Sequence, residues 1–189
     1  MTAEFALYLA LFLPLGAMAL IGALAPWPKA RDAAHVGTAA ITFALVLVLL
    51  HAMLAGEVPQ LFLFEVMPGL PLSFALEPLG MVFGLLASGL WIVIAVYAAG
   101  YMRAAGEAHQ TRFAIFFILA IAATLGIAFA SNLFTLFIFY ELLTLSTYPL
   151  VAHKGTPEAR NGARTYLAIL LSTSIGFFLV AIIWTWTAT

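Results

Sequence analysis

Long stretches of this sequence contain no charged residue, and this feature restricts the fold more than any other. Five charge-free windows follow one another: Phe5–Pro28, Ala33–Gly56, Pro78–Met102, Phe113–Tyr140 and Thr165–Thr189. Beyond Glu141 the fourth window continues to Ala152, and Ser131-Asn132 divides it into two spans. Six segments result, each close to the roughly 20 residues that cross a bilayer as a helix. They lack the period-two alternation of barrel strands and are about twice as long.

The overall composition supports a membrane protein. Hydrophobic residues make up 65% of the 189 and charged residues only 8%, whereas soluble domains have about a quarter charged residues. We therefore predict an all-α membrane protein with a single membrane domain over residues 1–189. The predicted helices cover residues 4–27, 34–55, 78–102, 112–130, 132–153 and 163–187, with an outer loop at 56–77.

The positions of the lysines and arginines predict the orientation. All seven basic residues fall in alternate loops: Lys29, Arg31, Arg103, Arg112, Lys154, Arg160 and Arg164. The other side carries acids without a basic residue: Glu4, Glu57, Glu65 and Glu77. By the positive-inside rule the basic loops are cytoplasmic, and six spans place both termini on the outer, periplasmic side. The expected location is the cell inner (cytoplasmic) membrane, with multiple spans.

Two local patterns add detail. Alternation around Leu61–Glu65 indicates a short strand or hairpin in the outer loop. Small residues recur one helical turn apart in two segments, at Gly80, Gly84 and Ser88 and at Ser172 and Gly176. This spacing suits close helix–helix contact, although small residues are also common in membrane helices generally.

Glu141 is the acid that an apolar segment, residues 131–153, carries near its middle. It lies about 13 Å along a helix from Asn132 and about 18 Å from His153, so it is near the bilayer midplane. Thr144 and Tyr148 share its helical face. This narrow polar stripe should face other helices and not lipid.

An ionised carboxylate at that depth costs several kcal/mol or more unless it is paired. Burial favours the neutral acid and a neighbouring cation favours the carboxylate, so a balance of the two suits proton uptake and release. The structural alternative is a permanently protonated Glu141 that is hydrogen-bonded across helices. His153, at the inner end of the same segment, is a candidate proton uptake group.

No cofactor or metal site is expected from the motifs. The chain has no cysteine, no glycine-rich phosphate loop and no pair of metal ligands at helical spacing. His35, His51 and His109 are interpreted as interfacial or loop residues. One alternative from another class is a haem-binding membrane anchor with His35 and His153 as ligands.

Two stretches resemble a known family. "NLFTLFIFYELLTLSTYPLVAH" and "EARNGARTYLAILLSTSIGFFL" are similar to the fifth and sixth transmembrane helices of antiporter-like subunits. Such subunits occur in respiratory complex I (NADH-quinone oxidoreductase), in Mrp-type cation/proton antiporters and in membrane-bound hydrogenases. The D-type subunits of the Mrp and hydrogenase relatives are the nearest in appearance. "LSFALEPLGMVFGLLASGLWIVIAVYAAGYM" resembles the third helix, where an acid often stands at the position of Glu77.

The resemblance implies a membrane subunit that translocates protons or cations, matching the N-terminal six of about fourteen helices. Glu141 matches the fifth-helix glutamate, which in the family pairs with a lysine on the broken seventh helix. Here the only lysines, Lys29 and Lys154, are expected in loops. The resemblance therefore implies that the positive partner of Glu141 comes from another chain, or that Glu141 stays neutral.

The expected ion-translocation residues are Glu141, Thr144, Tyr148 and His153, with Arg160, Arg164 and Glu77 in supporting or uptake roles. The expected partners are other membrane subunits of a hetero-oligomeric complex, lipid, protons and Na⁺ as an alternative ion, and no nucleic acid. The chain is not expected to be catalytic alone. It would serve either a redox-driven oxidoreductase or a multisubunit antiporter, which the sequence leaves open. A structural or assembly subunit without transport of its own is the alternative function.

Overall fold

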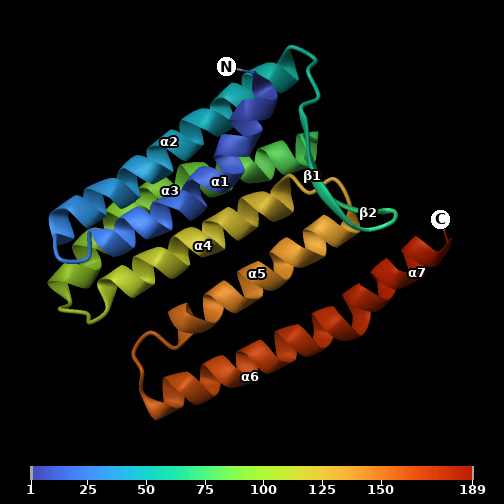
Figure 1. Ribbon diagram of the computed structural model, residues 1–189. Coiled ribbons are helices and arrows are strands. Elements are labelled where there is room, and N and C mark those ends of the chain that lie inside the picture. Colours follow the sequence, from blue (N-terminus) through green and yellow to red (C-terminus); the bar gives the residue numbers. More distant parts are fainter. Residues whose placement is uncertain (1, 189) are drawn as a thin grey trace.

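The computed structural model describes residues 2–188 as a bundle of long helices with one β-hairpin (Figure 1). The helices are α1 (Ala3–Ala23), α2 (Pro28–Leu54), α3 (Pro78–Ala104), α4 (Gln110–Ala128), α5 (Leu133–Val151), α6 (Pro157–Thr173) and α7 (Val180–Ala188). A π-helical segment, η1 (Ser174–Leu179), joins α6 to α7, so that Pro157–Ala188 forms one long helical span. Within the described residues, six helical spans are long and apolar enough to cross a membrane.

The helices form a compact group of four with two further spans laid beside it. α1, α2, α3 and α4 pack on one another, α5 packs on α4, and the α6–α7 span packs mainly on α5 (Figure 1). One buried apolar cluster includes Leu7, Leu49 and Phe129, and a second includes Ile21 and Trp91. Apolar side chains also cover most of the outer surface, as expected where lipid replaces water as the solvent.

The outer loop forms the hairpin that its alternating pattern indicated. Strands β1 (Gln60–Met67) and β2 (Leu70–Ala75) are antiparallel, and Gly69 takes a positive φ of 81° in the turn. Main-chain bonds attach β2 to the junction between α4 and α5: the Ala75 amide donates to the Phe129 carbonyl at 2.9 Å, and the Ser131 amide donates to the Ser73 carbonyl at 3.1 Å. The hairpin is therefore built into the bundle.

Several helix ends differ from the sequence prediction. The first helix ends at Ala23 and not at 27, and the second begins at Pro28 and not at 34. The last span begins at Pro157 and not at 163. The two helix starts were predicted too late for the same reason. Charged residues follow Pro28 and Pro157 directly and were left outside the predicted helices, whereas each proline occupies a first-turn position that suits it. The other ends lie within two residues of the predicted ones.

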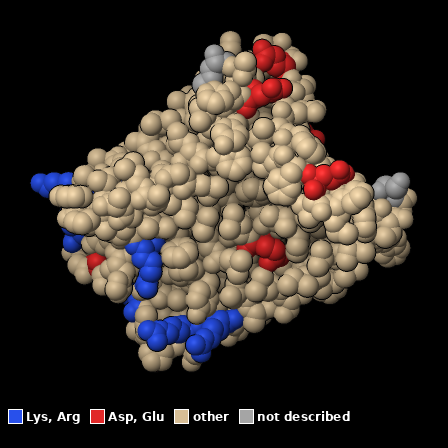
Figure 2. All heavy atoms as spheres, in the orientation of Figure 1, with Lys and Arg blue, Asp and Glu red and all other residues tan. Residues whose placement is uncertain are grey.

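Charge separates the two ends of the bundle. Lysines and arginines gather at the end where α1 meets α2, α3 meets α4 and α5 meets α6, which we call the basic end (Figure 2). We call the opposite end the hairpin end. Lys29 and Arg31 were expected in a loop, but both lie in the first turn of α2. α1 begins and α7 finishes at the hairpin end (Figure 1).

The small residues of α3 make the close contact that their spacing indicated. A Cβ added to Gly80 would overlap the main-chain oxygen of Ala128, and one added to Gly84 would lie 2.7 Å from the Phe129 ring. Ser88 is fully buried and donates its hydroxyl to the Gly84 carbonyl at 2.6 Å. Ser172 and Gly176 make no such contact within residues 2–188, because both are exposed and no atom lies within 4 Å of a Cβ added to Gly176.

Gly80→Ala should reduce the free energy of unfolding by about 1–3 kcal/mol, because the main chain of α4 cannot move away as a side chain could. Gly16→Ala is the matched control, since it also adds one methyl group to an apolar helix, but with nothing within 4 Å. Its effect should be neutral or stabilising by up to about 1 kcal/mol. Thermal unfolding in detergent measures both. Equal stability of the two variants would contradict the close α3–α4 approach.

Candidate functional site

Glu141 lies in the middle of α5, and its carboxyl group is the central feature of the candidate site. The side chain is half-buried. Its Oε1 atom is shielded from solvent and has no hydrogen-bond partner among residues 2–188. Because a buried carboxyl oxygen is costly without a partner, Glu141 is the strongest candidate for a functional residue in this span.

Aromatic contacts show which way this face of α5 is turned. Phe137, one turn before Glu141, meets the Phe178 ring edge-on with centroids 5.6 Å apart. Tyr140 meets the same ring at 6.3 Å. Phe178 belongs to η1, so the Glu141 side of α5 is directed toward the α6–α7 span. Thr144, which shares this face, is 4% exposed, and Tyr148 is half-buried.

A cavity of about 360 Å³ lies open at the surface between α5 and the π-helical segment. Its lining includes Tyr140, Thr173, Ser174 and Phe178. Tyr140 precedes Glu141 directly, and the two hydroxyl residues come from the opposite helix. Ser174 starts η1 and donates its hydroxyl to the Leu170 carbonyl at 3.0 Å. π-Helical turns often occur at functional positions, and this one brings polar groups beside the helix that carries Glu141.

His153 follows the end of α5 at the basic end. The Arg112 guanidinium donates to its carbonyl at 2.9 Å, and its ring meets Phe113 edge-on at 5.6 Å. Both ring nitrogens are shielded from solvent in the described part of the chain. Burial first, and then the nearby Arg112 charge, lowers the pKa of His153 below 6.5. The neutral ring is therefore favoured near neutral pH.

The remaining predicted residues do not gather around Glu141. Arg160 and Arg164 are exposed on the first turns of α6, at the basic end. Glu77 is exposed before the first turn of α3, at the hairpin end. Of the predicted set, only Thr144 and Tyr148 share a helix face with Glu141.

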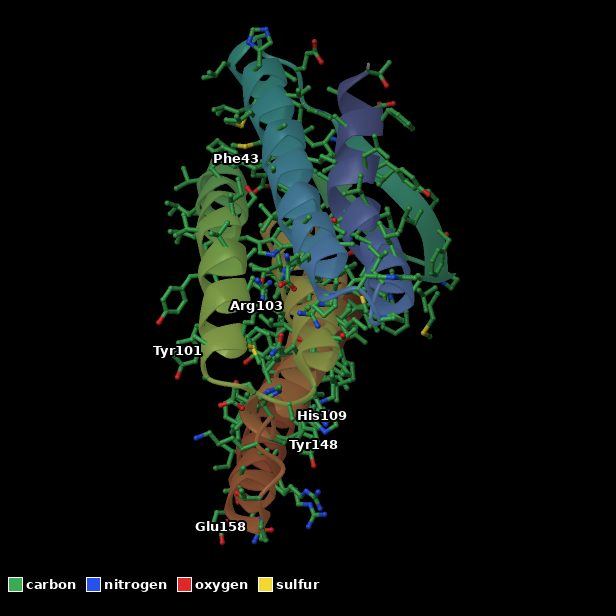
Figure 3. All side chains as sticks on the ribbon, turned by 90° about the vertical axis from the view of Figure 1, so that its left-hand side faces the viewer. Phe43, Tyr101, Arg103, His109, Tyr148 and Glu158 are labelled. Atoms are coloured by element: carbon green, nitrogen blue, oxygen red, sulfur yellow. The ribbon has the colours of Figure 1, made fainter. Side chains whose placement is uncertain are left out.

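Sequence reasoning missed a charged cluster at the basic end, which we call the Arg31–Asp32 cluster. Arg31 is 5% exposed and donates from Nε to Asp32 at 2.9 Å and from Nη1 to the Thr111 hydroxyl at 3.1 Å. Arg31 Nη2 donates to Asp32 Oδ1 at 2.6 Å and to Gln110 Oε1 at 3.1 Å. Arg103 forms an ion pair with the second oxygen of Asp32. The cluster joins α2, α3 and α4, and Figure 3 shows Arg103 turned inward while Tyr101 points outward.

His35 was interpreted as an interfacial residue, and this was wrong. It is 6% exposed, and its Nε2 accepts a hydrogen bond from the indole N–H of Trp91 at 3.0 Å. An iron atom bound to Nε2 would displace this bond, so the haem alternative gains nothing from the structure. The signal for the cluster was present in the sequence: Arg31 and Asp32 lie one helical turn from His35 once the helix is begun at Pro28.

Comparison with known proteins supports the family resemblance. Residues 130–189, which include α5 and the last span, match the transmembrane family described as NADH:quinone oxidoreductase/Mrp antiporter. A putative antiporter subunit mnhA2 from Staphylococcus haemolyticus is 29% identical over 93 residues, covering 49% of this chain and 12% of the relative. The Na(+)/H(+) antiporter subunit A1 from Staphylococcus aureus (strain bovine RF122 / ET3-1) is 29% identical over 119 residues. The match covers 60% of this chain and 15% of the relative.

Two solved structures share the fold. A chain of the membrane-bound sulfane sulfur reductase, an archaeal respiratory membrane complex, has a TM-score of 0.79 at 21% identity over 97% of this chain and 28% of its own. A chain of the Mrp complex from Dietzia sp. DQ12-45-1b has a TM-score of 0.71 at 24% identity. The match covers 93% of this chain and 19% of that chain. The resemblance to antiporter-like subunits is therefore confirmed.

The chain is a multi-pass membrane protein that resembles antiporter subunits. It spans less than a third of each relative described above. Those two curated relatives are an A1-type and an mnhA2 protein, whereas the sequence suggested the D type.

Asp32→Asn should destabilise the fold by about 3 kcal/mol, because it leaves the buried Arg31 guanidinium without its carboxylate. Glu158→Gln is the control, since it also removes one acid at the basic end, but from an exposed first-turn position (Figure 3). Its effect should stay below about 1 kcal/mol. Thermal unfolding in detergent measures both variants. An Asp32→Asn protein as stable as Glu158→Gln would show that the cluster does not hold the three helices.

The lowered pKa of His153 predicts a contribution to the pH dependence of stability. The unfolded chain takes up a proton as pH falls through about 6.5, while the folded protein resists this, so unfolding becomes easier below that pH. His153→Gln should show a shallower loss of stability between pH 7.5 and 5.5 than the unchanged chain. Melting temperatures across this range measure the difference. Parallel curves for the two proteins would contradict the burial of the ring.

Proposed function

We propose that this chain is a membrane subunit of a proton- or cation-translocating complex, in which Glu141 is the protonatable group at the middle of the membrane. Its positive partner in this proposal is a lysine supplied by another chain. Thr144 and Tyr148 extend the polar face of α5, and His153 handles protons at the basic end. Whether the complex is driven by a redox reaction or by an ion gradient is outside the proposal.

The single observation that carries this proposal is the unpartnered Oε1 of Glu141. Asp32, an acid near the start of α2 whose side chain is 14% exposed, has its charge offset by two arginines. Lys29 and Lys154 are both exposed at the basic end, away from the middle of α5. Among the described residues, Glu141 therefore has no cationic partner. This suits a proposal in which the cation belongs to another chain and binds reversibly.

The cavity beside Tyr140 supports access to this site. It has room for several water molecules, and Thr173 and Ser174 add hydroxyl groups to its wall. In the proposal, water or a cation reaches Glu141 from the α5–α6 groove, and protons reach the groove through His153. Arg160 and Arg164 help by keeping the basic end hydrated. Glu77 provides an acid at the opposite, hairpin end.

The exposed last span supports the presence of partner subunits. Only 11% of its apolar window is buried, against 39% for α2 and α4. Large apolar side chains point outward along its length, including Ile169, Phe177 and Trp184. We place the neighbouring subunits of the complex on this face. By the positive-inside rule, the basic end is cytoplasmic in the inner membrane, and both termini are on the outer side.

Glu141→Gln tests the transport role. The amide keeps the size of the side chain but cannot bind or release a proton, so the complex should assemble and lose coupled ion movement. The measurement uses the purified complex in vesicles, with a trapped pH dye and with added Na⁺ as a second arm. Proton and Na⁺ movement should both fall to the level of protein-free vesicles.

Glu57→Gln is the matched control, because Glu57 is an exposed acid at the hairpin end. It should leave transport unchanged. Unchanged transport in Glu141→Gln would reject the proposed role of the carboxyl. A normal transport rate per complex with a reduced yield of complex would instead support the structural or assembly function.

A further inference from the structure

A small, partly open cavity lined by both polar and apolar side chains lies between α2, α3 and α4, on different helices from Glu141. Its volume is about 20 Å³, above the roughly 10–15 Å³ that one water molecule needs. Its polar lining consists of Arg31, Asp32, His35 and Gln110, and alanine, methionine and phenylalanine side chains complete the wall. None of the residues that line this cavity takes part in the ion translocation proposed above or belongs to the stretches on which the family resemblance to the fifth and sixth helices rests.

Two of the four polar residues around the cavity are buried, and Asp32 and Gln110 are partly buried. Arg31 is 5% exposed and His35 is 6% exposed. Apolar neighbours close the deeper side, where Trp91 and Ala114 belong to the second buried cluster. Polar groups held away from solvent in this way need hydrogen-bond partners.

The remaining hydrogen-bonding capacity of these side chains can be counted. Arg31 Nη1 donates one of its two N–H groups to Thr111, which leaves one N–H. Asp32 Oδ1 accepts two bonds from Arg31, and Oδ2 accepts one from Arg103, which leaves one lone pair on Oδ2. Gln110 Oε1 accepts one bond from Arg31, which leaves a second lone pair. Its amide group donates to the carbonyls of Met102 and Glu107, so no donor remains.

His35 supplies the fourth group. Since Nε2 accepts from Trp91, the neutral ring carries its proton on Nδ1, which is then a donor. Nδ1 is the polar atom left to face the cavity. The lining thus offers two donors, on Arg31 and His35, and two acceptors, on Asp32 and Gln110.

We propose that this cavity binds one internal water molecule. Water has two donors and two acceptors, which complement the four unused groups. It accepts from His35 Nδ1–H and Arg31 Nη1–H, and it donates to Asp32 Oδ2 and Gln110 Oε1. His35 is thereby connected to the Arg31–Asp32 cluster without a direct bond.

Charge excludes the alternative occupants of this size. A metal cation would meet the charges of Arg31 and Arg103 with one carboxylate, already paired to both, as its only anionic ligand. An anion would meet the Asp32 carboxylate. Around His35, α2 presents Arg31 and Asp32, α3 presents Trp91 and Arg103, and α4 presents Gln110; α1 contributes apolar groups such as Ile21. A neutral ligand that both donates and accepts fits this environment.

Solid-state NMR of the full chain in lipid bilayers, labelled with ¹⁵N-histidine, tests the proposal. The His35 signals are assigned by their loss in His35→Gln. We expect a protonated Nδ1, an unprotonated Nε2, and magnetisation transfer from water to the Nδ1 proton at short mixing times.

Ala99→Val provides the cavity-filling variant, because Ala99 lines the cavity. It should abolish the water transfer while the Nε2 signal stays that of an acceptor for Trp91. Gly100→Ala is the matched control on the same helix, since its added methyl group meets no atom within 4 Å. It should leave the transfer unchanged. Ala98→Val, which fills the cavity from the neighbouring position, replaces Ala99→Val if that protein does not fold.

The proposal is overturned by a proton on Nε2 of His35, or by the absence of water transfer in the unchanged chain. Transfer that persists in the cavity-filling variant would also overturn it, because the water would then reach His35 by another route. None of these outcomes depends on transport by Glu141.

Discussion

Lipid cannot hydrogen-bond a peptide group, and the rest of this structure depends on that constraint. Each apolar span therefore forms a helix, whose main-chain groups bond within the segment. Where the chain leaves helical structure, between α4 and α5, the hairpin supplies the missing partners: the Ala75 amide donates to the Phe129 carbonyl, and the Ser73 carbonyl accepts from the Ser131 amide. Asn132 completes the arrangement: its side chain accepts from the Thr135 amide and donates to the Pro71 carbonyl. The junction between α4 and α5, which precedes the helix that carries Glu141, is thus held in place by hydrogen bonds to the hairpin.

Asp32 and Glu141, two acids within the bundle, differ in whether their carboxyl oxygens have partners. At the basic end, Asp32 is held by two arginines and the cluster links three helices. In the middle of α5, Glu141 has an oxygen without a partner in the described chain. The first arrangement is a fixed set of ion pairs, which costs a great deal to break. The second leaves a carboxyl oxygen unsatisfied, and acids placed within membrane spans are commonly functional.

The six spans and the hairpin could be predicted from the sequence, because charge-free windows and alternation are local patterns. The positions of the charged ends could not. Treating a charge as the end of a span placed Arg31 and Asp32 outside α2, since their mutual neutralisation depends on Arg103 and Gln110, far away in the sequence. The same dependence hid His35, whose burial is set by Trp91. The exposure of Gly176 likewise depends on which helices lie beside α6, and spacing within one helix does not contain that information.

The hairpin is held by the buried Phe74 side chain and by several hydrogen bonds that involve main-chain atoms. The Pro68 carbonyl accepts from the Trp186 indole, Pro71 offers its carbonyl to Asn132, and β2 bonds to the α4–α5 junction through amides and carbonyls. Bonds of this kind do not depend on the identity of the side chain at each position. The outward residues of β1, such as Phe62 and Phe64, are therefore free to diverge during evolution while the hairpin is retained. A search for distant homologues would then recognise this segment by its length and its turn glycine, Gly69, more readily than by its letters.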